Sequence, residues 1–420
     1  MAHSADGGAH DRTARRPADG TGRRAGSRGD APSRARPGRT AATAACCLAL
    51  LSPGPAAAAP TPSATGSSAA ISLPVIPTVL NGDECTGGSG RVAEPVPWAQ
   101  QHLGLSRVWQ LSRGEGVTVG VVDTGLATRA GDFAHDVGGS AAGRDCVGHG
   151  TFVAGLIAGA PRPGSGFSGV APGARVLAER GTDTAGAADA RLTARGIRAA
   201  VAGGASVVHV SAALPRRNAE LTEAVRDAVA RDVLVVAPAV PDAPPPVSGG
   251  QSPAPEAYWP AAVEGVLAVA PHGADGSRPQ EVKPAGARLS APGYGVTGRG
   301  PAGKGHFVGN GASVAAAFVA GTAALIRSYD PDLTASEVAG RLHRTGYPAD
   351  PPWLDPYAAL TATPADGSAG GRTPPGVLLP RAEKSDGSLG RALALTAAGA
   401  GAVLALAGAA ALVRRKRSAA

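Results

Sequence analysis

The chain has 420 residues, 43% of them hydrophobic, and a formal net charge of +8. The charge is concentrated at the ends: residues 1–40 contain nine Arg and four Asp, and Arg414–Arg417 adds four positive charges. Because the residues between are close to neutral, the basic balance does not indicate a nucleic-acid partner. No cluster of His and Cys has metal-ligand spacing, so we expect no metal and no other cofactor.

The N-terminal residues predict a targeting segment. Residues 1–40 contain too few apolar side chains to form a core. The short apolar run 41–51 follows several Arg, and Ala56–Ala59 then supplies small residues suitable for cleavage. We therefore interpret 1–59 as a basic stretch with a secretory signal peptide, too short to span a bilayer. Residues 60–96 form an N-terminal extension.

Residues 97–362 alternate between apolar runs and stretches with helical spacing. This alternation predicts an α/β domain whose central, mostly parallel sheet is covered by helices on both faces. Thr334 and Glu337 form a capping box that begins a late helix. The expected strands are 117–122, 174–177, 206–210, 233–237 and 265–270, and helices are expected at 192–201 and 221–230.

The C-terminal residues predict a membrane anchor. Residues 363–391 are rich in Gly, Pro and Ser, which is typical of a tether. Residues 392–413 are uncharged and long enough for the roughly 20 residues that a membrane-spanning helix needs. The basic tail 414–420 should remain cytoplasmic, which places the α/β domain outside the cell on a single-pass anchor.

Three short segments, in the order Asp, His, Ser, are typical of nucleophilic catalysis. Asp123 follows an apolar strand, and His149 and Ser313 each begin a helix of small residues. A Ser hydroxyl needs a base to take its proton, His is the natural base, and a carboxylate fixes the His tautomer. The helix that begins at Ser313 would direct backbone N–H groups toward a developing oxyanion.

Two cysteines remain once the signal peptide is removed. Cys46 and Cys47 lie in the signal, whereas Cys85 and Cys146 stay in the exported protein. Outside the cell such a pair predicts a disulfide bond.

The motifs around these residues resemble those of the subtilisin-like (S8) serine proteases, and most closely the mycosins associated with type VII secretion. The resemblance implies a serine endopeptidase with Asp123, His149 and Ser313 as its triad. It also implies a protein or peptide substrate and partners among type VII membrane components. The segments that carry it are 97–109, 112–125, 145–151, 169–175 and 355–360.

Some positions depart from the family pattern. Ala312 and Ala317 stand where Thr and Pro are usual around the nucleophile, and Val240-Pro241 stands where the family has the oxyanion Asn. Losing one oxyanion donor costs roughly 10²–10³ in kcat.

Other residues around the predicted cleft are assigned by likeness. The family implies that the backbone at Ser211 pairs with an extended substrate, and Asn310 is a further oxyanion or substrate-binding candidate. His209, where the family commonly has Asn, is interpreted as a core histidine, with a catalytic surrogate as the alternative.

Three functions remain open on the sequence. The first is a membrane-anchored extracytoplasmic endopeptidase, slowed by its altered oxyanion residues. The second is a catalytically impaired pseudoprotease that acts as a structural subunit of the secretion complex. The third is an unrelated anchored binding protein.

Overall fold

The computed structural model describes residues 72–129, 131–243, 255–278 and 286–362, with four isolated residues nearer the C-terminus. The predicted signal peptide and tether lie outside the described residues. So does the predicted span 392–413, apart from three isolated positions. These assignments therefore stay predictions.

Six parallel strands form the central sheet, in the order β2-β1-β3-β4-β5-β6. Helices cover both faces, which is why the strands between are almost entirely apolar and buried. The five predicted strands are all present, with ends shifted by at most three residues. The strands are β1 Thr118–Asp123, β2 Arg175–Arg180, β3 Val207–Val210, β4 Leu234–Pro238, β5 Leu267–His272 and β6 Leu289–Pro292.

One face of the sheet is covered by α4 (Ala190–Ala202) and α5 (Ala219–Ala230), which pack on β1, β2 and β4. Each helix begins where a side chain accepts a backbone N–H: Asp189 accepts from Leu192 and Asn218 from Leu221. Such caps satisfy donors that have no partner within the helix.

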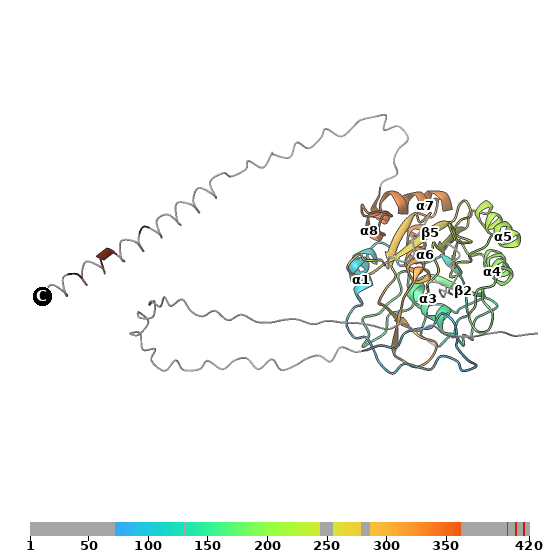
Figure 1. Ribbon diagram of the computed structural model, residues 1–420. Helices are drawn as coiled ribbons and strands as arrows, with labels where there is room; N and C mark the ends of the chain where they lie inside the picture. The colour runs from blue at the N-terminus through green and yellow to red at the C-terminus, as the bar shows by residue number, and fades with distance from the viewer. Residues whose placement is uncertain are drawn as a thin grey trace, which may run out of the picture. The chain divides into compact units, whose positions relative to one another are not determined.

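The opposite face is covered by α3 (His149–Ala158) and α6 (Ala312–Tyr329), which also pack on each other (Figure 1). All residues of α3 are buried, and its small side chains allow this close packing. At Gly150 an added Cβ would lie 2.1 Å from the carbonyl oxygen of Gly125. Glycine is therefore required where α3 meets the loop after β1.

Helix α6 is the one described helix long and apolar enough to cross a membrane, but 83% of its apolar window is buried inside the fold. It contacts β3, β4, β5 and β6 and is the central helix of the domain. The late helix predicted from its capping box is α7 (Ala335–Arg344), where Thr334 and Glu337 make both reciprocal hydrogen bonds.

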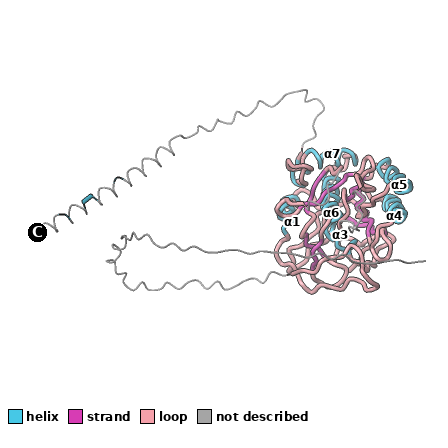
Figure 2. The backbone as a smooth tube through the Cα atoms, viewed as in Figure 1, coloured by secondary structure: helices cyan, strands magenta, loops and turns pink. Residues whose placement is uncertain are grey.

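Several short elements were not predicted because four to six residues show no clear periodicity. Besides β6 they include an antiparallel pair, β7 and β8, and loops make up much of the remaining described chain (Figure 2). Their bounds are α1 Trp98–His102, α2 Leu105–Val108, β7 Val296–Arg299, β8 His306–Gly309 and α8 Pro356–Thr361.

The N-terminal extension is joined to the domain by backbone hydrogen bonds and by a disulfide. Ile76 donates to the Val308 carbonyl of β8, and Val308 donates back to Pro74. The predicted Cys85–Cys146 disulfide is present. It ties the extension to the segment that leads into α3, three residues before His149.

Candidate active site

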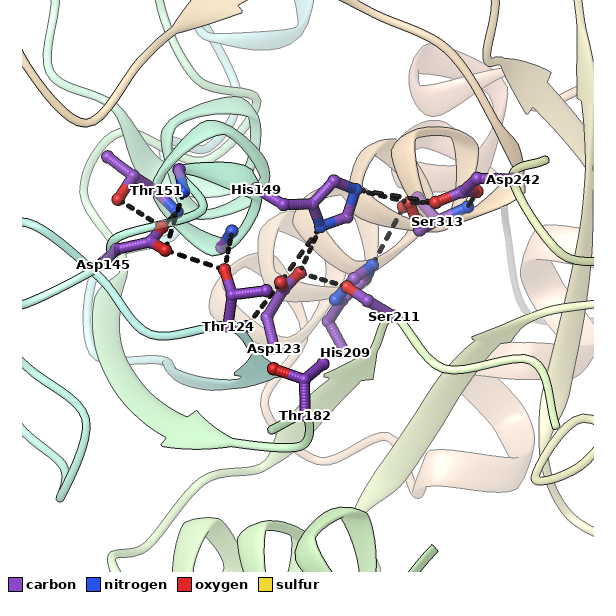
Figure 3. A network of polar contacts seen from close by, with 12 residues as sticks. Asp123, Thr124, Asp145, His149, Thr151, Thr182, His209, Ser211, Asp242 and Ser313 are labelled. Carbon is purple, nitrogen blue, oxygen red and sulfur yellow. Dashed lines mark hydrogen bonds and ion pairs between the residues drawn. The ribbon is translucent and has the colours of Figure 1, made fainter. Parts of the chain in front are cut away.

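The predicted Asp, His and Ser meet at the carboxyl edge of the sheet (Figure 3). Asp123 is the last residue of β1, His149 is the first of α3, and Ser313 is the second of α6. The carboxyl ends of parallel strands expose functional groups at one edge, so the topology itself brings the three together. All three are buried, with exposed fractions of 1%, 3% and 0%.

Their side chains form a continuous chain of polar contacts. His149 Nδ1 lies 2.9 Å from Asp123 Oδ2, and His149 Nε2 lies 3.1 Å from Ser313 Oγ. Burial alone would lower the pKa of His149, but the carboxylates of Asp123 and Asp242 raise it well above 6.5. Burial alone would raise the pKa of Asp123, but His149, Ser211 and the Thr124 N–H hold it below its ordinary value. The pair therefore favours carboxylate and imidazolium.

Two neighbours fix the Asp123 carboxylate. The Ser211 hydroxyl donates to Oδ2, and the Thr124 N–H donates to Oδ1 over 2.6 Å. The Ser211 side chain thus contacts the triad. The pairing of its backbone with substrate, which the family implies, stays a prediction.

A second buried carboxylate, Asp145, supports the start of α3, and sequence reasoning did not single it out. Its Oδ1 accepts from Thr124 Oγ1 and Gly148 N, each over 2.8 Å. Its Oδ2 accepts from the N–H and the hydroxyl of Thr151, over 2.8 and 2.7 Å. Burial raises the pKa of Asp145, against the hydrogen bonds from Thr151 and Gly148 that lower it. Asp145 joins the loop after β1 to the helix that carries His149.

A third carboxylate, Asp242, contacts the nucleophile directly. Its Oδ1 accepts from the Ser313 N–H over 2.8 Å, and its Oδ2 accepts from the Ser313 hydroxyl over 2.6 Å. Asp242 Oδ2 also lies 3.5 Å from His149 Nε2. From the sequence we placed Val240-Pro241 where the family has the oxyanion Asn. The residue that reaches Ser313 is the next one along the chain.

Its place in the topology could have indicated Asp242. It is the first polar residue after β4, at the same carboxyl edge of the sheet as Asp123. Gly311 makes room for it, because a Cβ there would lie 2.1 Å from Asp242 Oδ1. Gly311 has φ 133°, a backbone conformation that favours glycine.

The remaining candidates lie around Ser313. Asn310 Oδ1 accepts from Gly295 N over 2.7 Å, and in the described part of the chain its side chain makes no hydrogen bond to the triad. His209 is fully buried and its Nε2 donates to the Ser313 carbonyl over 3.0 Å. Burial lowers the pKa of His209, although the Ser313 carbonyl opposes this. His209 is therefore a neutral side chain that helps to position Ser313 through its backbone carbonyl.

The arrangement can carry out nucleophilic chemistry. A Ser hydroxyl lies within reach of an imidazole that a carboxylate orients, at the N-terminus of an 18-residue helix. Such a constellation can pass the Ser313 proton to His149 while Ser313 Oγ attacks a carbonyl. Among the residues that the structure describes, no group of three or more His, Cys, Asp or Glu could hold a metal ion.

The fold and this site define a subtilisin-like serine protease, and the comparison with known families agrees. The model of the Subtilase family matches residues 114–366. The chain therefore belongs to the subtilase family and is a serine endopeptidase.

Within that family the chain is related to the mycosins. Mycosin-4 of Mycobacterium tuberculosis (strain ATCC 25618 / H37Rv) is 32% identical over 389 residues, covering 79% of this chain and 85% of the mycosin. The structure of a serine protease MycP1, described as an essential component of the type VII (ESX-1) secretion system, has 28% identity and a TM-score of 0.56. It covers 70% of this chain and 100% of that one. A chain in the periplasmic assembly from the ESX-5 inner membrane complex has 26% identity and a TM-score of 0.57, covering 74% and 98%.

Proposed function

We propose that this protein is a membrane-anchored, extracytoplasmic endopeptidase that cleaves protein or peptide substrates beside a type VII secretion complex. Asp123 orients His149, His149 acts first as base and then as acid, and Ser313 attacks the scissile carbonyl. The observation that supports this most directly is the contact of 3.1 Å between Ser313 Oγ and a His149 already oriented by Asp123.

The proposed location outside the cell, on a membrane anchor, is supported by the sequence and by the similar proteins. The signal 1–59, the tether 363–391, the span 392–413 and the tail 414–420 together describe a single-pass protein with domain 97–362 outside the cell. The ESX-5 neighbour belongs to an inner membrane complex. We propose the same kind of partner for this chain, namely membrane components of a type VII system.

We further propose that the enzyme is slow at neutral pH because its oxyanion site is altered. The Ser313 N–H, which should face the developing oxyanion, donates to the Asp242 carboxylate instead. A carboxylate is an acceptor, whereas the oxyanion needs donors. The same contact favours a second candidate function, in which the chain is a pseudoprotease that serves the secretion complex as a structural subunit.

Labelling with a fluorophosphonate separates the two functions. We expect the purified full-length protein to be labelled and the Ser313→Ala variant to remain unlabelled, with circular dichroism confirming that both are folded. Labelling that persists in Ser313→Ala would place the reaction elsewhere. If neither Ser313 nor any other residue is labelled in folded protein between pH 4 and 9, the structural-subunit function replaces the enzyme.

A further inference from the structure

The Asp242 carboxylate occupies the position that the substrate oxyanion would need. In the acyl-transfer step Ser313 Oγ bonds to the scissile carbonyl carbon, the Ser313 proton passes to His149 Nε2, and the carbonyl oxygen takes the negative charge. That oxygen needs the Ser313 N–H, and Asp242 Oδ1 already accepts from it over 2.8 Å. An ionised Asp242 therefore both occupies a donor and places a negative charge beside the charge that develops.

The same carboxylate also redirects the proton of the nucleophile. The Ser313 hydroxyl donates to Asp242 Oδ2 over 2.6 Å, so its single proton faces away from His149. His149 Nε2 lies 3.5 Å from Asp242 Oδ2, close enough for the imidazolium to be stabilised by a second carboxylate. In this arrangement His149, the base, is already protonated. The Ser313 hydroxyl donates to the Asp242 carboxylate and not to the base.

The charged and titratable groups around Asp242 come from three further elements. His149 faces it from α3, His209 from β3 and Tyr294 from the turn after β6. Burial and the Asp242 charge together raise the pKa of Tyr294. Within the described chain no Lys or Arg forms an ion pair with Asp242, so His149 is its principal cationic neighbour.

We propose that Asp242 is a further catalytic residue that acts as a neutral acid: protonated, it donates a hydrogen bond to the oxyanion, and ionised, it holds Ser313 in an inactive arrangement. This inference rests on the proposed role of Ser313 as nucleophile. Activity requires one proton on Asp242 while His149 is neutral.

The resting ion pair and the active arrangement contain the same number of protons. In the resting pair the shared proton lies on His149; in the active arrangement it lies on Asp242. Because activity requires this one proton and no more, we expect a bell-shaped pH profile. Below the bell both groups are protonated and His149 cannot act as base. Above this pH range neither His149 nor Asp242 carries the shared proton, and the negative charge of Asp242 opposes the charge that develops on the oxyanion.

The test is the pH dependence of fluorophosphonate labelling in the full-length protein and in Asp242→Asn. The amide keeps an oxygen for the Ser313 N–H and adds a permanent donor without charge. We expect the wild-type rate to peak at acidic pH and fall toward pH 8. The rate for Asp242→Asn should rise to a plateau at neutral and alkaline pH, about 10²-fold above wild type at pH 8, as expected for one oxyanion donor.

Two further variants separate the possible causes. Asp242→Ala removes the charge without adding a donor, so it should remain below Asp242→Asn at pH 8 and lose the acidic maximum. Asp136→Asn, the same chemical change at an exposed position, should retain the wild-type profile.

The inference is overturned if, at pH 8, Asp242→Asn is labelled at the wild-type rate or more slowly. Slower labelling is also the result expected if Asp242 itself serves as the base. Labelling of wild type at Ser313 in that experiment would leave the proposed function intact. Absence of Ser313 labelling in every variant, Asp242→Asn included, overturns both.

Discussion

Replacing Gly150 by Ala should separate the catalytic residues without removing any of them. Gly150 directly follows His149 in α3, and a Cβ at this position would lie 2.1 Å from the Gly125 carbonyl oxygen. Cβ atoms essentially never approach other heavy atoms within 3.0 Å. The start of α3 must therefore move by at least about 0.9 Å relative to the loop after β1, the difference between these two distances.

That displacement should lengthen the contact between His149 and Asp123, because His149 lies on α3 and Asp123 lies at the end of β1. A misplacement of about 1 Å at an active site can cost about 10²-fold in rate. Overpacking of a buried site typically costs about 1–3 kcal/mol of stability. Alanine is favoured over glycine in a helix by up to about 1 kcal/mol, which offsets part of this cost.

Gly155 in the same helix provides the matched control, because the nearest atom to a Cβ there is Arg299 Cβ at 3.9 Å. Gly155→Ala should therefore keep the labelling rate and be as stable as wild type or slightly more so. The assay is the fluorophosphonate labelling rate together with the unfolding temperature of each variant. Equal labelling rates for Gly150→Ala and Gly155→Ala would refute the argument that the glycine sets the position of His149.

Three other changes test structural features outside the triad. Asp145 accepts four hydrogen bonds, two of them from backbone N–H groups. In Asp145→Asn the Nδ2 cannot accept, so one backbone N–H, of Gly148 or Thr151, loses its acceptor, whereas the threonine hydroxyl on that side can turn and accept from Nδ2. In a Ser313→Ala background this variant should lose about 1–3 kcal/mol of stability, and Asp136→Asn should lose none. Cys85→Ser opens a disulfide that joins residues 61 apart, which should cost about 4 kcal/mol and make the extension sensitive to added protease. Burial lowers the pKa of His306 to about 4, so its stabilising contribution is complete above pH 6.5 and is lost as the pH falls toward 4; His306→Asn should flatten that part of the stability profile.

Each of these has a clear contrary result. Equal unfolding temperatures for Asp145→Asn and Asp136→Asn would show that the buried network does not hold α3. Titration of a free Cys146 thiol in the native wild-type protein would contradict the disulfide. An unchanged slope of stability between pH 6.5 and 4 in His306→Asn would assign the acid sensitivity to other groups.

The sequence predicts the central elements of the fold because their patterns are long and regular. The apolar runs that became β1 to β5, and the helical spacing of α4 and α5, each continue for several residues with one periodicity. The hairpin β7–β8 has only four residues in each strand, and a glycine lies in both, so no alternation is visible. Its pairing depends on contacts with the extension and with α3, which are distant in the sequence.

The candidate site could be predicted only as far as local motifs extend. Asp123, His149 and Ser313 each stand in a recognisable local context. Asp242 does not, because it lies in a Pro-rich loop and reaches Ser313 across 71 residues of sequence. The contact exists only because the end of β4 and the start of α6 lie together at the carboxyl edge of the sheet.

The physical cost of the site favours an enzyme over a purely structural subunit. Asp123 and His149 are almost completely buried, and replacing a buried ion pair by apolar residues is often neutral or stabilising by about 1–4 kcal/mol. A structural subunit could therefore lose the pair without loss of stability. This chain instead contains the pair and supports it with Ser211, Thr124 and the Asp145 network. A buried ion pair that costs stability and is held by several hydrogen bonds is expected where function requires it. We therefore infer that Ser313 is a working nucleophile and that the Asp242 carboxylate restrains it.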